Sequence, residues 1–215
     1  MSASHRPGEA LLELVAVMDR LRRECPWDQE QTHDSLAPYL LEEAHEVLEA
    51  LDARDRSGLR EELGDLLLQV LFHARIAAEH PEEPWDLDAV AGDARDKMVR
   101  RHPHVFAGRS VDGAAEVAVN WEEIKAAEKS RASVLDGVPP SLPALARADK
   151  VLGRLERAGY DFDAVPTGEN RSAADQEIGA ALLASVAAAR AAGVDPEGAL
   201  RRTLRELEAS VRAAE

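Results

Sequence analysis

An all-α fold is predicted by three features of the sequence. Ala, Leu, Glu and Arg are the commonest residues, runs of β-branched residues are almost absent, and only 4% of the residues are aromatic. This composition favours helix over sheet. Apolar residues recur at helical spacing through most of the 215-residue chain, and 45% of the residues are hydrophobic, which is enough to bury a core. We therefore expect a bundle of helices.

The N-terminal part of the chain shows five stretches of helical periodicity. They cover residues 9–23, 35–54, 59–79, 85–101 and 114–129. Pro26 interrupts the pattern after the first stretch, so a loop is expected from there at least to Gln31. The sequence DRSG, which ends in Gly58, suits a tight turn, and the second and third helices should form an antiparallel hairpin. HPHVFAGRSVDG (102–113) is expected to be a loop.

A change of composition divides the chain near residue 135. SVLDGVPPSLPAL (133–145) is rich in Pro, and the residues after it are richer in Ala and poorer in aromatic residues. We expect a first domain over residues 1–135 and a second over 136–215. The second domain should contain helices over residues 142–158, 173–192 and 196–213.

The second domain also contains a weak internal repeat. QEIGAALL, which begins at Gln176, follows the pattern of EELGDLLL, which begins at Glu61, with Ala180 in the place of Asp65. The pattern is equally consistent with a duplication that has lost an acid and with a chance match of two Ala-rich helices.

Charge and composition exclude several classes of protein. The net charge of −15 would repel a phosphate backbone, so no nucleic-acid partner is expected, although a small phosphorylated ligand fits if metal ions offset the charge. The single Cys25 cannot form an internal disulfide, and the first residues carry no signal-peptide pattern. No apolar run approaches the roughly 20 residues of a membrane span. We expect a soluble cytoplasmic protein with no membrane partner.

Acids interrupt the apolar faces of the predicted hairpin. On a helical wheel, Glu43 projects from the apolar stripe of the second helix, and Glu46 lies at its edge one turn further on. Glu62 and Asp65 have the same spacing in the first turns of the third helix, which is apolar nearly all round. Four carboxylates cannot be buried together without a positive charge, and clustered oxygen ligands suit Mg²⁺ or Mn²⁺. We predict a metal site; the alternative is a solvated acidic face.

A second kind of metal site is disfavoured. Di-iron helical bundles use E-x-x-H pairs on separate long helices, and two such pairs occur here, Glu30 with His33 and Glu42 with His45. The two histidines are only twelve residues apart, and Glu42 and His45 face away from the apolar stripe. His73 follows an apolar run and is interpreted as a core histidine with satisfied hydrogen bonds.

The ordered set of motifs resembles the MazG branch of the all-α nucleoside triphosphate pyrophosphohydrolases. EEAHE (42–46) followed by EELGD (61–65) matches the EExxE…ExxD signature of that superfamily. LRRECPWDQEQTHDSL (21–36), RRHPHVF (100–106) and NWEEIKAAEK (120–129) also resemble MazG. The similarity runs from about residue 11 to residue 150. It implies the helical bundle of that superfamily, followed by a degenerate second MazG-like repeat.

The resemblance assigns roles to nine residues. It implies that the Mg²⁺ ligands are Glu43, Glu46, Glu62 and Asp65, with Glu42 as a supporting acid. The residues in blocks that contact nucleotide in this family are Lys97, Arg101, Trp121 and Lys125. Lys and Arg can neutralise a triphosphate, and an indole offers a stacking face. Alternatively, Lys97 and Arg101 are a solvated pair and Trp121 is a core anchor, while Trp27 is interpreted as a packing residue.

The resemblance also implies an activity. It indicates metal-dependent hydrolysis of (deoxy)nucleoside triphosphates between the α and β phosphates, releasing a nucleoside monophosphate and pyrophosphate, in a homodimer or larger homo-oligomer that cleans the nucleotide pool. The second region, which lacks EExxE, would have no catalysis of its own. There is no GxxxxGK[ST] motif, which disfavours P-loop chemistry. The alternative is a non-catalytic nucleotide-binding or regulatory helical module.

Overall fold

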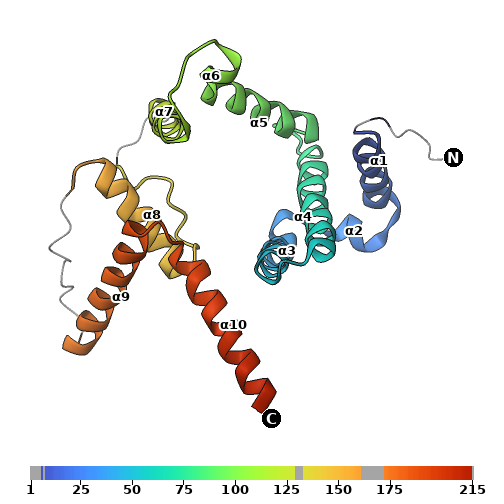
Figure 1. Ribbon diagram of the computed structural model, residues 1–215. Helices are drawn as coiled ribbons and strands as arrows, with labels where there is room; N and C mark the ends of the chain where they lie inside the picture. The colour runs from blue at the N-terminus through green and yellow to red at the C-terminus, as the bar shows by residue number, and fades with distance from the viewer. Residues whose placement is uncertain (1–5, 7, 129–132, 161–171, 215) are drawn as a thin grey trace. The chain divides into compact units, whose positions relative to one another are not determined.

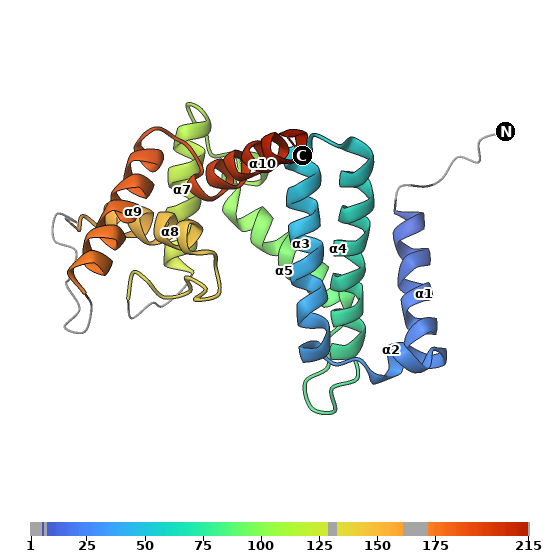
Figure 2. The ribbon, with the colours of Figure 1, turned by 90° about the horizontal axis from the view of Figure 1, so that it is seen from below.

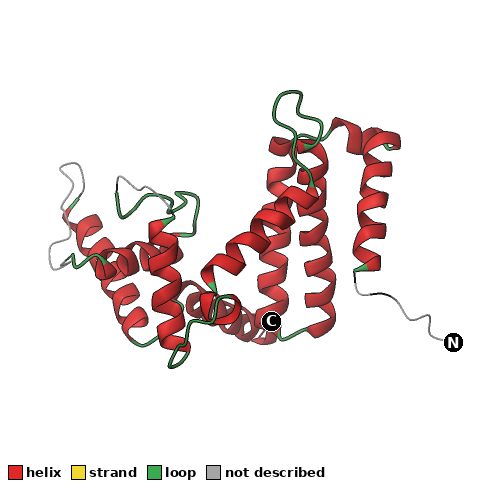
Figure 3. Cartoon of the chain, turned by 90° about the horizontal axis from the view of Figure 1, so that it is seen from above, coloured by secondary structure: helices red, strands yellow, loops and turns green. Residues whose placement is uncertain are grey.

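The structure is a computed structural model that describes residues 6, 8–128, 133–160 and 172–214. Every regular element in these ranges is a helix, with no strand among them (Figure 3). The prediction of an all-α fold is therefore confirmed.

The chain forms two compact units, Met1–Ile124 and Lys125–Glu215. The boundary expected at residue 135 from composition thus lies inside the second unit. The division falls within α7 (Ala114–Ala127), before the Pro-rich segment. The assignment of catalysis to the first part alone stays a prediction.

Four helices build the start of the first unit. They are α1 (Glu9–Glu24), α2 (Pro26–Glu30), α3 (His33–Ala53) and α4 (Arg56–Ala77). α3 and α4 lie side by side along their lengths, and α1 packs beside α4 (Figures 1 and 2). Thr32 and Ser35 form a capping box at the start of α3, which satisfies two of the backbone groups left open at a helix end.

The connection between α3 and α4 differs in detail from the expected turn. Arg54 adopts a left-handed conformation (φ 56°) and ends α3, and the side chain of Asp55 accepts from the Ser57 N–H and caps α4. Gly58 therefore lies inside α4 and not in the turn. A Cβ at this position would lie 2.8 Å from Oδ2 of Asp55, so the glycine leaves space for the capping carboxylate.

Two expected loops contain short helices. Pro26 begins α2, and Pro103 begins α6 (Pro103–Phe106). In each case the proline occupies the first helical position, where its missing N–H has no partner to lose. A proline that ends one helix thus begins the next.

The core of the first unit lies where α1, α3 and α4 meet. Met18, Leu36, Leu71 and Phe72 are each at most 4% exposed. α4 is apolar nearly all round but is not buried all round in this chain, because Leu63, Leu67 and Val70 are 36–49% exposed. The buried face of α4 lies in its second half.

The rest of the first unit continues from α4. α5 (Leu87–Arg101) packs against α4 and is capped by Asp86, whose carboxylate accepts from the Ala89 N–H at 3.0 Å. α6 follows and packs against α5.

The second unit consists of α8 (Ala144–Arg157), α9 (Ala173–Ala191) and α10 (Pro196–Ala214). Arg190 on α9 contacts Asp149 and Glu156 on α8, each at 3.0 Å. The buried Arg154 donates to the carbonyls of Val134 and Asp136, so α8 holds the preceding segment. No single helix among the described residues is long and apolar enough to cross a membrane; α9 and α10 pass only as a pair bent by 103°.

Replacing Leu36 by Ala should destabilise the first unit. Leu36 is 1% exposed at the centre of the core, and large-to-small changes at such sites cost about 2–5 kcal/mol. Leu41→Ala is the matched control on the same helix, because Leu41 is 62% exposed. Denaturant unfolding followed by circular dichroism measures both. Equal losses in the two variants would contradict the assigned core.

Candidate metal and nucleotide site

Three carboxylates meet between α3 and α4. Oxygen atoms of Glu43, Glu62 and Asp65 all lie within 4.8 Å of one another. Glu43 comes from the middle of α3, and the other two come from the first half of α4. Because only Arg54 and Asp55 separate the two helices, the short connection fixes the register that brings these acids together.

Glu46 belongs to the same cluster. Its carboxyl group lies close enough to those of Glu43 and Glu62 to raise the pKa of each. The structure therefore brings together all four acids that the sequence places on the apolar faces. We call Glu43, Glu46, Glu62 and Asp65 the acid cluster. Glu42 is exposed, consistent with its position on the other side of α3.

The acids in the cluster disfavour one another's ionised forms. Burial raises the pKa of Glu43, and the nearby carboxylates of Asp65, Glu46 and Glu62 raise it further. Burial also raises the pKa of Glu62, with contributions from Glu46, Glu61 and Asp65. All the charged groups that act on these two glutamates are acids. Like charges held together in this way favour protonation of one of them or the binding of a cation.

The donor set fits a hard divalent cation. Carboxylate oxygens are the ligands that Mg²⁺ and Mn²⁺ prefer, and three oxygens from two helices already converge. Glu43 and Glu62 are half-buried, so a cation here would be partly shielded from solvent. The metal site stays a prediction, and a solvated acidic face is its alternative.

A second group of predicted site residues lies on α5 and α7. Arg101 is 8% exposed, and its guanidinium carbon lies 5.1 Å from the centre of the Trp121 ring. The interpretation of Arg101 as half of a solvated pair is therefore wrong, although Lys97 is exposed. Trp121 and Lys125 are half-buried. The nucleotide-binding role of these four residues stays a prediction.

Three residues near this second group were not predicted from the sequence: His102, Arg109 and Asn120. The ring of His102 lies 4.9 Å from that of Trp121, and its Nδ1 contacts the Met98 carbonyl at 2.7 Å. Arg109 donates to Oδ1 of Asn120 at 2.7 Å, and the buried Nδ2 of Asn120 has no partner among the described residues. The available signal was that Asn120 and His102 stand inside the NWEEIK and RRHPHVF blocks.

His73 was expected to have satisfied hydrogen bonds, and Trp27 was expected to be a packing residue. Nδ1 of His73 lies 2.8 Å from Nδ1 of His33, but the buried Nε2 of His73 has no partner in the described part of the chain. His73 is thus only half satisfied. The expectation for Trp27 is consistent with its edge-on contacts with Tyr39 and Phe72 at 6.1 and 6.3 Å.

The raised pKa values predict how stability depends on pH in the absence of metal. A carboxyl whose folded pKa is raised stabilises the fold below its unfolded pKa, about 4.3 for Glu, and loses that contribution as pH rises through the folded value. Glu43→Gln should therefore raise the melting temperature at pH 7 without metal and flatten its decline from about pH 4.3 upward. Thermal melts in chelator from pH 4 to 8 test this. A lower melting temperature at pH 7 would contradict the repulsion.

A family model and several similar proteins point to the same family. The model of the MazG nucleotide pyrophosphohydrolase domain matches residues 31–106, which include the whole acid cluster. A nucleoside triphosphate pyrophosphohydrolase of Escherichia coli K12 is 40% identical over 94% of this chain and 86% of that protein. One from Mycolicibacterium smegmatis is 45% identical over 97% of this chain and 62% of that protein.

A Thermotoga maritima protein named nucleoside triphosphate pyrophosphohydrolase/pyrophosphatase MazG is 38% identical over 90% of this chain and 81% of that protein. Among solved structures, a mazG-related protein from the same organism is 29% identical, with a TM-score of 0.47 over 54% of this chain and 98% of that one. The family model and the extended sequence identity agree with the motifs and with the helices that carry them: the chain belongs to the MazG family.

Proposed function

We propose that this chain is a metal-dependent nucleoside triphosphate pyrophosphohydrolase. The observation that carries the proposal is the convergence of Glu43, Glu62 and Asp65 oxygens within 4.8 Å. Relatives from three bacteria bear the name of this activity. The bond hydrolysed is the α–β phosphoanhydride of a (deoxy)nucleoside triphosphate, and the products are the monophosphate and pyrophosphate.

The acid cluster would hold Mg²⁺, with Mn²⁺ as a substitute. When bound, the cation supplies charge neutralisation at the phosphate oxygens and activation of a water. Oxygen atoms of Glu43, Glu62 and Asp65 converge, Glu46 adds a nearby negative charge, and the mutual repulsion of these acids favours the binding of a cation. Glu42, outside the cluster, would support it from the exposed side of α3.

Basic residues on α5 and α7 would bind the rest of the triphosphate. Lys97 is exposed and would reach a phosphate, whereas Arg101 contacts the Trp121 ring. Lys125 adds a third cation. Stabilising the departing pyrophosphate requires such charges where negative charge grows. The Trp121 ring would offer a stacking face to the base.

A homodimer or larger assembly accords with the exposed apolar residues of α4. Leu63, Leu67 and Val70 lie in a helix otherwise built for burial, and contiguous exposed apolar surface marks association sites. The second unit would support stability or assembly and not chemistry, since Ala180 stands where an acid would be needed. Removal of unwanted nucleotides is the proposed role.

Removing one acid should abolish turnover. Glu62→Gln and Asp65→Asn each take a charged ligand from the cluster, so hydrolysis of a nucleoside triphosphate with Mg²⁺ should fall by a factor of about 10² or more. Glu49→Gln on α3 is the matched control and should keep near wild-type rates. Circular dichroism checks that helicity is unchanged. Full activity of either cluster variant would refute the metal assignment and favour the alternative of a binding module.

The position of cleavage separates this mechanism from that of a phosphatase. The primary products should be a nucleoside monophosphate and pyrophosphate, and orthophosphate should appear only after a pyrophosphatase is added. ³¹P NMR of the reaction mixture distinguishes them directly. Lys97→Ala should slow turnover without unfolding the protein, because its side chain is exposed. A diphosphate with free orthophosphate would overturn the proposed bond.

A further inference from the structure

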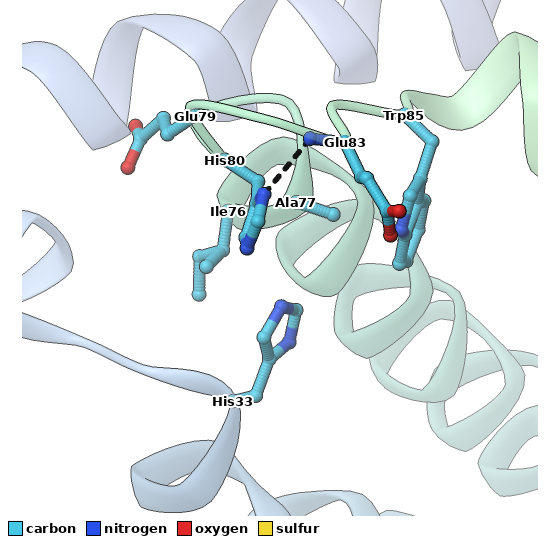
Figure 4. Close-up of a pocket in the computed structure, with 7 residues that line it drawn as sticks. All are labelled: His33, Ile76, Ala77, Glu79, His80, Glu83 and Trp85. Atoms are coloured by element: carbon cyan, nitrogen blue, oxygen red, sulfur yellow. Dashed lines mark hydrogen bonds between the residues drawn. The ribbon is translucent and has the colours of Figure 1, made fainter.

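A pocket of about 410 Å³ lies at the open end of the α3–α4 hairpin, where α3 begins and α4 ends. Its walls come from the start of α3, the end of α4 and the segment that leads to α5 (Figure 4). The lining residues are His33, Ile76, Ala77, Glu79, His80, Glu83 and Trp85. Ile76 and Ala77 are apolar, and the other five residues carry imidazole, indole or carboxylate groups. None of the functional assignments made above uses this pocket.

The protonation of His80 follows from its hydrogen bonds. Its Nδ1 accepts from the backbone N–H groups of Glu82 and Glu83 at 3.3 and 3.0 Å. An imidazole nitrogen that accepts cannot carry the proton, so neutral His80 carries it on Nε2. Figure 4 shows this edge of the ring pointing into the pocket toward His33. His80 therefore offers an N–H donor there, and a nitrogen that carries a proton is not a metal ligand.

The protonation of His33 follows from its contact with His73. The two Nδ1 atoms lie 2.8 Å apart, so one must donate to the other. Nε2 of His73 is buried without a partner among the described residues, and an orphaned buried N–H is rarer than an orphaned acceptor. His73 thus carries its proton on Nδ1 and donates to His33. Nε2 of His33 is then protonated, which gives the pocket a second donor.

The opposite side of the pocket supplies an acceptor and a flat surface. Glu83 and Trp85 both line the pocket (Figure 4), and Trp85 is 44% exposed. The rings of His33 and Trp85 are nearly parallel, at 18° and 6.4 Å between centres. Glu79 adds little charge, since Arg22 and Arg75 hold its carboxylate at 2.8 and 2.9 Å. The remaining charge, on Glu83, disfavours an anion.

This pocket shares no lining residue with the acid cluster. His33 and Glu43 are separated by ten residues of α3, which corresponds to about 15 Å along a helix. The pocket is therefore a separate place for a ligand.

We propose that this pocket binds the heterocycle of a nucleobase or nucleoside at a site distinct from the acid cluster. The Nε2–H groups of His33 and His80 donate to its carbonyl oxygens, the Glu83 carboxylate accepts from its N–H groups, and the Trp85 indole stacks on its face. Adjacent donors and acceptors on a neutral planar ring are the pattern of a nucleobase edge. The site does not depend on the proposed hydrolysis.

Titration of the full chain with uridine and with guanosine tests the site, because neither nucleoside carries a phosphate. The readouts are the ¹⁵N-labelled indole N–H signal of Trp85, assigned with Trp85→Phe, and the His80 ring signals. We expect saturable shifts. Trp85→Ala should weaken binding at least about fivefold through lost stacking, and His80→Ala about threefold to tenfold through one lost hydrogen bond.

Two control variants separate this site from others. His45→Ala removes an exposed histidine elsewhere on α3 and should leave nucleoside binding unchanged. Glu62→Gln disables the acid cluster and should also leave it unchanged, so failure of the proposed hydrolysis would not affect this result. The proposal is overturned if neither nucleoside shifts the Trp85 signal, if His80→Ala and His45→Ala behave alike, or if Glu62→Gln abolishes binding.

Discussion

The packing of α3 against α4 is the interaction on which the rest of the first unit depends. Only Arg54 and Asp55 connect these helices, and the αL conformation of Arg54 with the Asp55 cap leaves little freedom in their register. A shift of one residue would rotate each helix by about 100° relative to its partner. Glu43 would then lose its position opposite Glu62 and Asp65.

The buried core residues and the acid cluster occupy different parts of the same hairpin. Leu36, Leu71 and Phe72 are buried near the start of α3 and the second half of α4, whereas the acids occupy the half nearest the connection. The repulsion within the acid cluster therefore acts where few apolar residues are buried. A cluster that raises the pKa of its own glutamates needs such support from elsewhere, because a functional site that opposes folding must be held by the surrounding structure.

Periodicity predicted the long helices well because apolar residues at helical spacing mark them, and side-chain caps add to this at the starts of α3, α4, α5 and α9. It failed at Pro26 and Pro103, where a proline both ends a pattern and begins a short helix. The acid cluster was predictable because burying an acid inside an apolar stripe costs free energy unless a metal ion or a charged partner compensates for it. The contact of Arg101 with Trp121 was not predictable, since α5 and α7 are joined by a long segment whose path no local pattern specifies.

The pocket at His33 illustrates a different limit of sequence analysis. His33, His73 and His80 come from three segments, and each is unremarkable in its own context. Their role in the pocket depends on which ring nitrogens carry protons. The backbone N–H groups of Glu82 and Glu83 determine the tautomer of His80. The buried nitrogen of His73 determines the tautomer of His33. Such linked hydrogen bonds exist only after α3 has packed on α4. The packing of α3 against α4 assembles both the acid cluster and the pocket at His33. A change in register would therefore disturb both sites together.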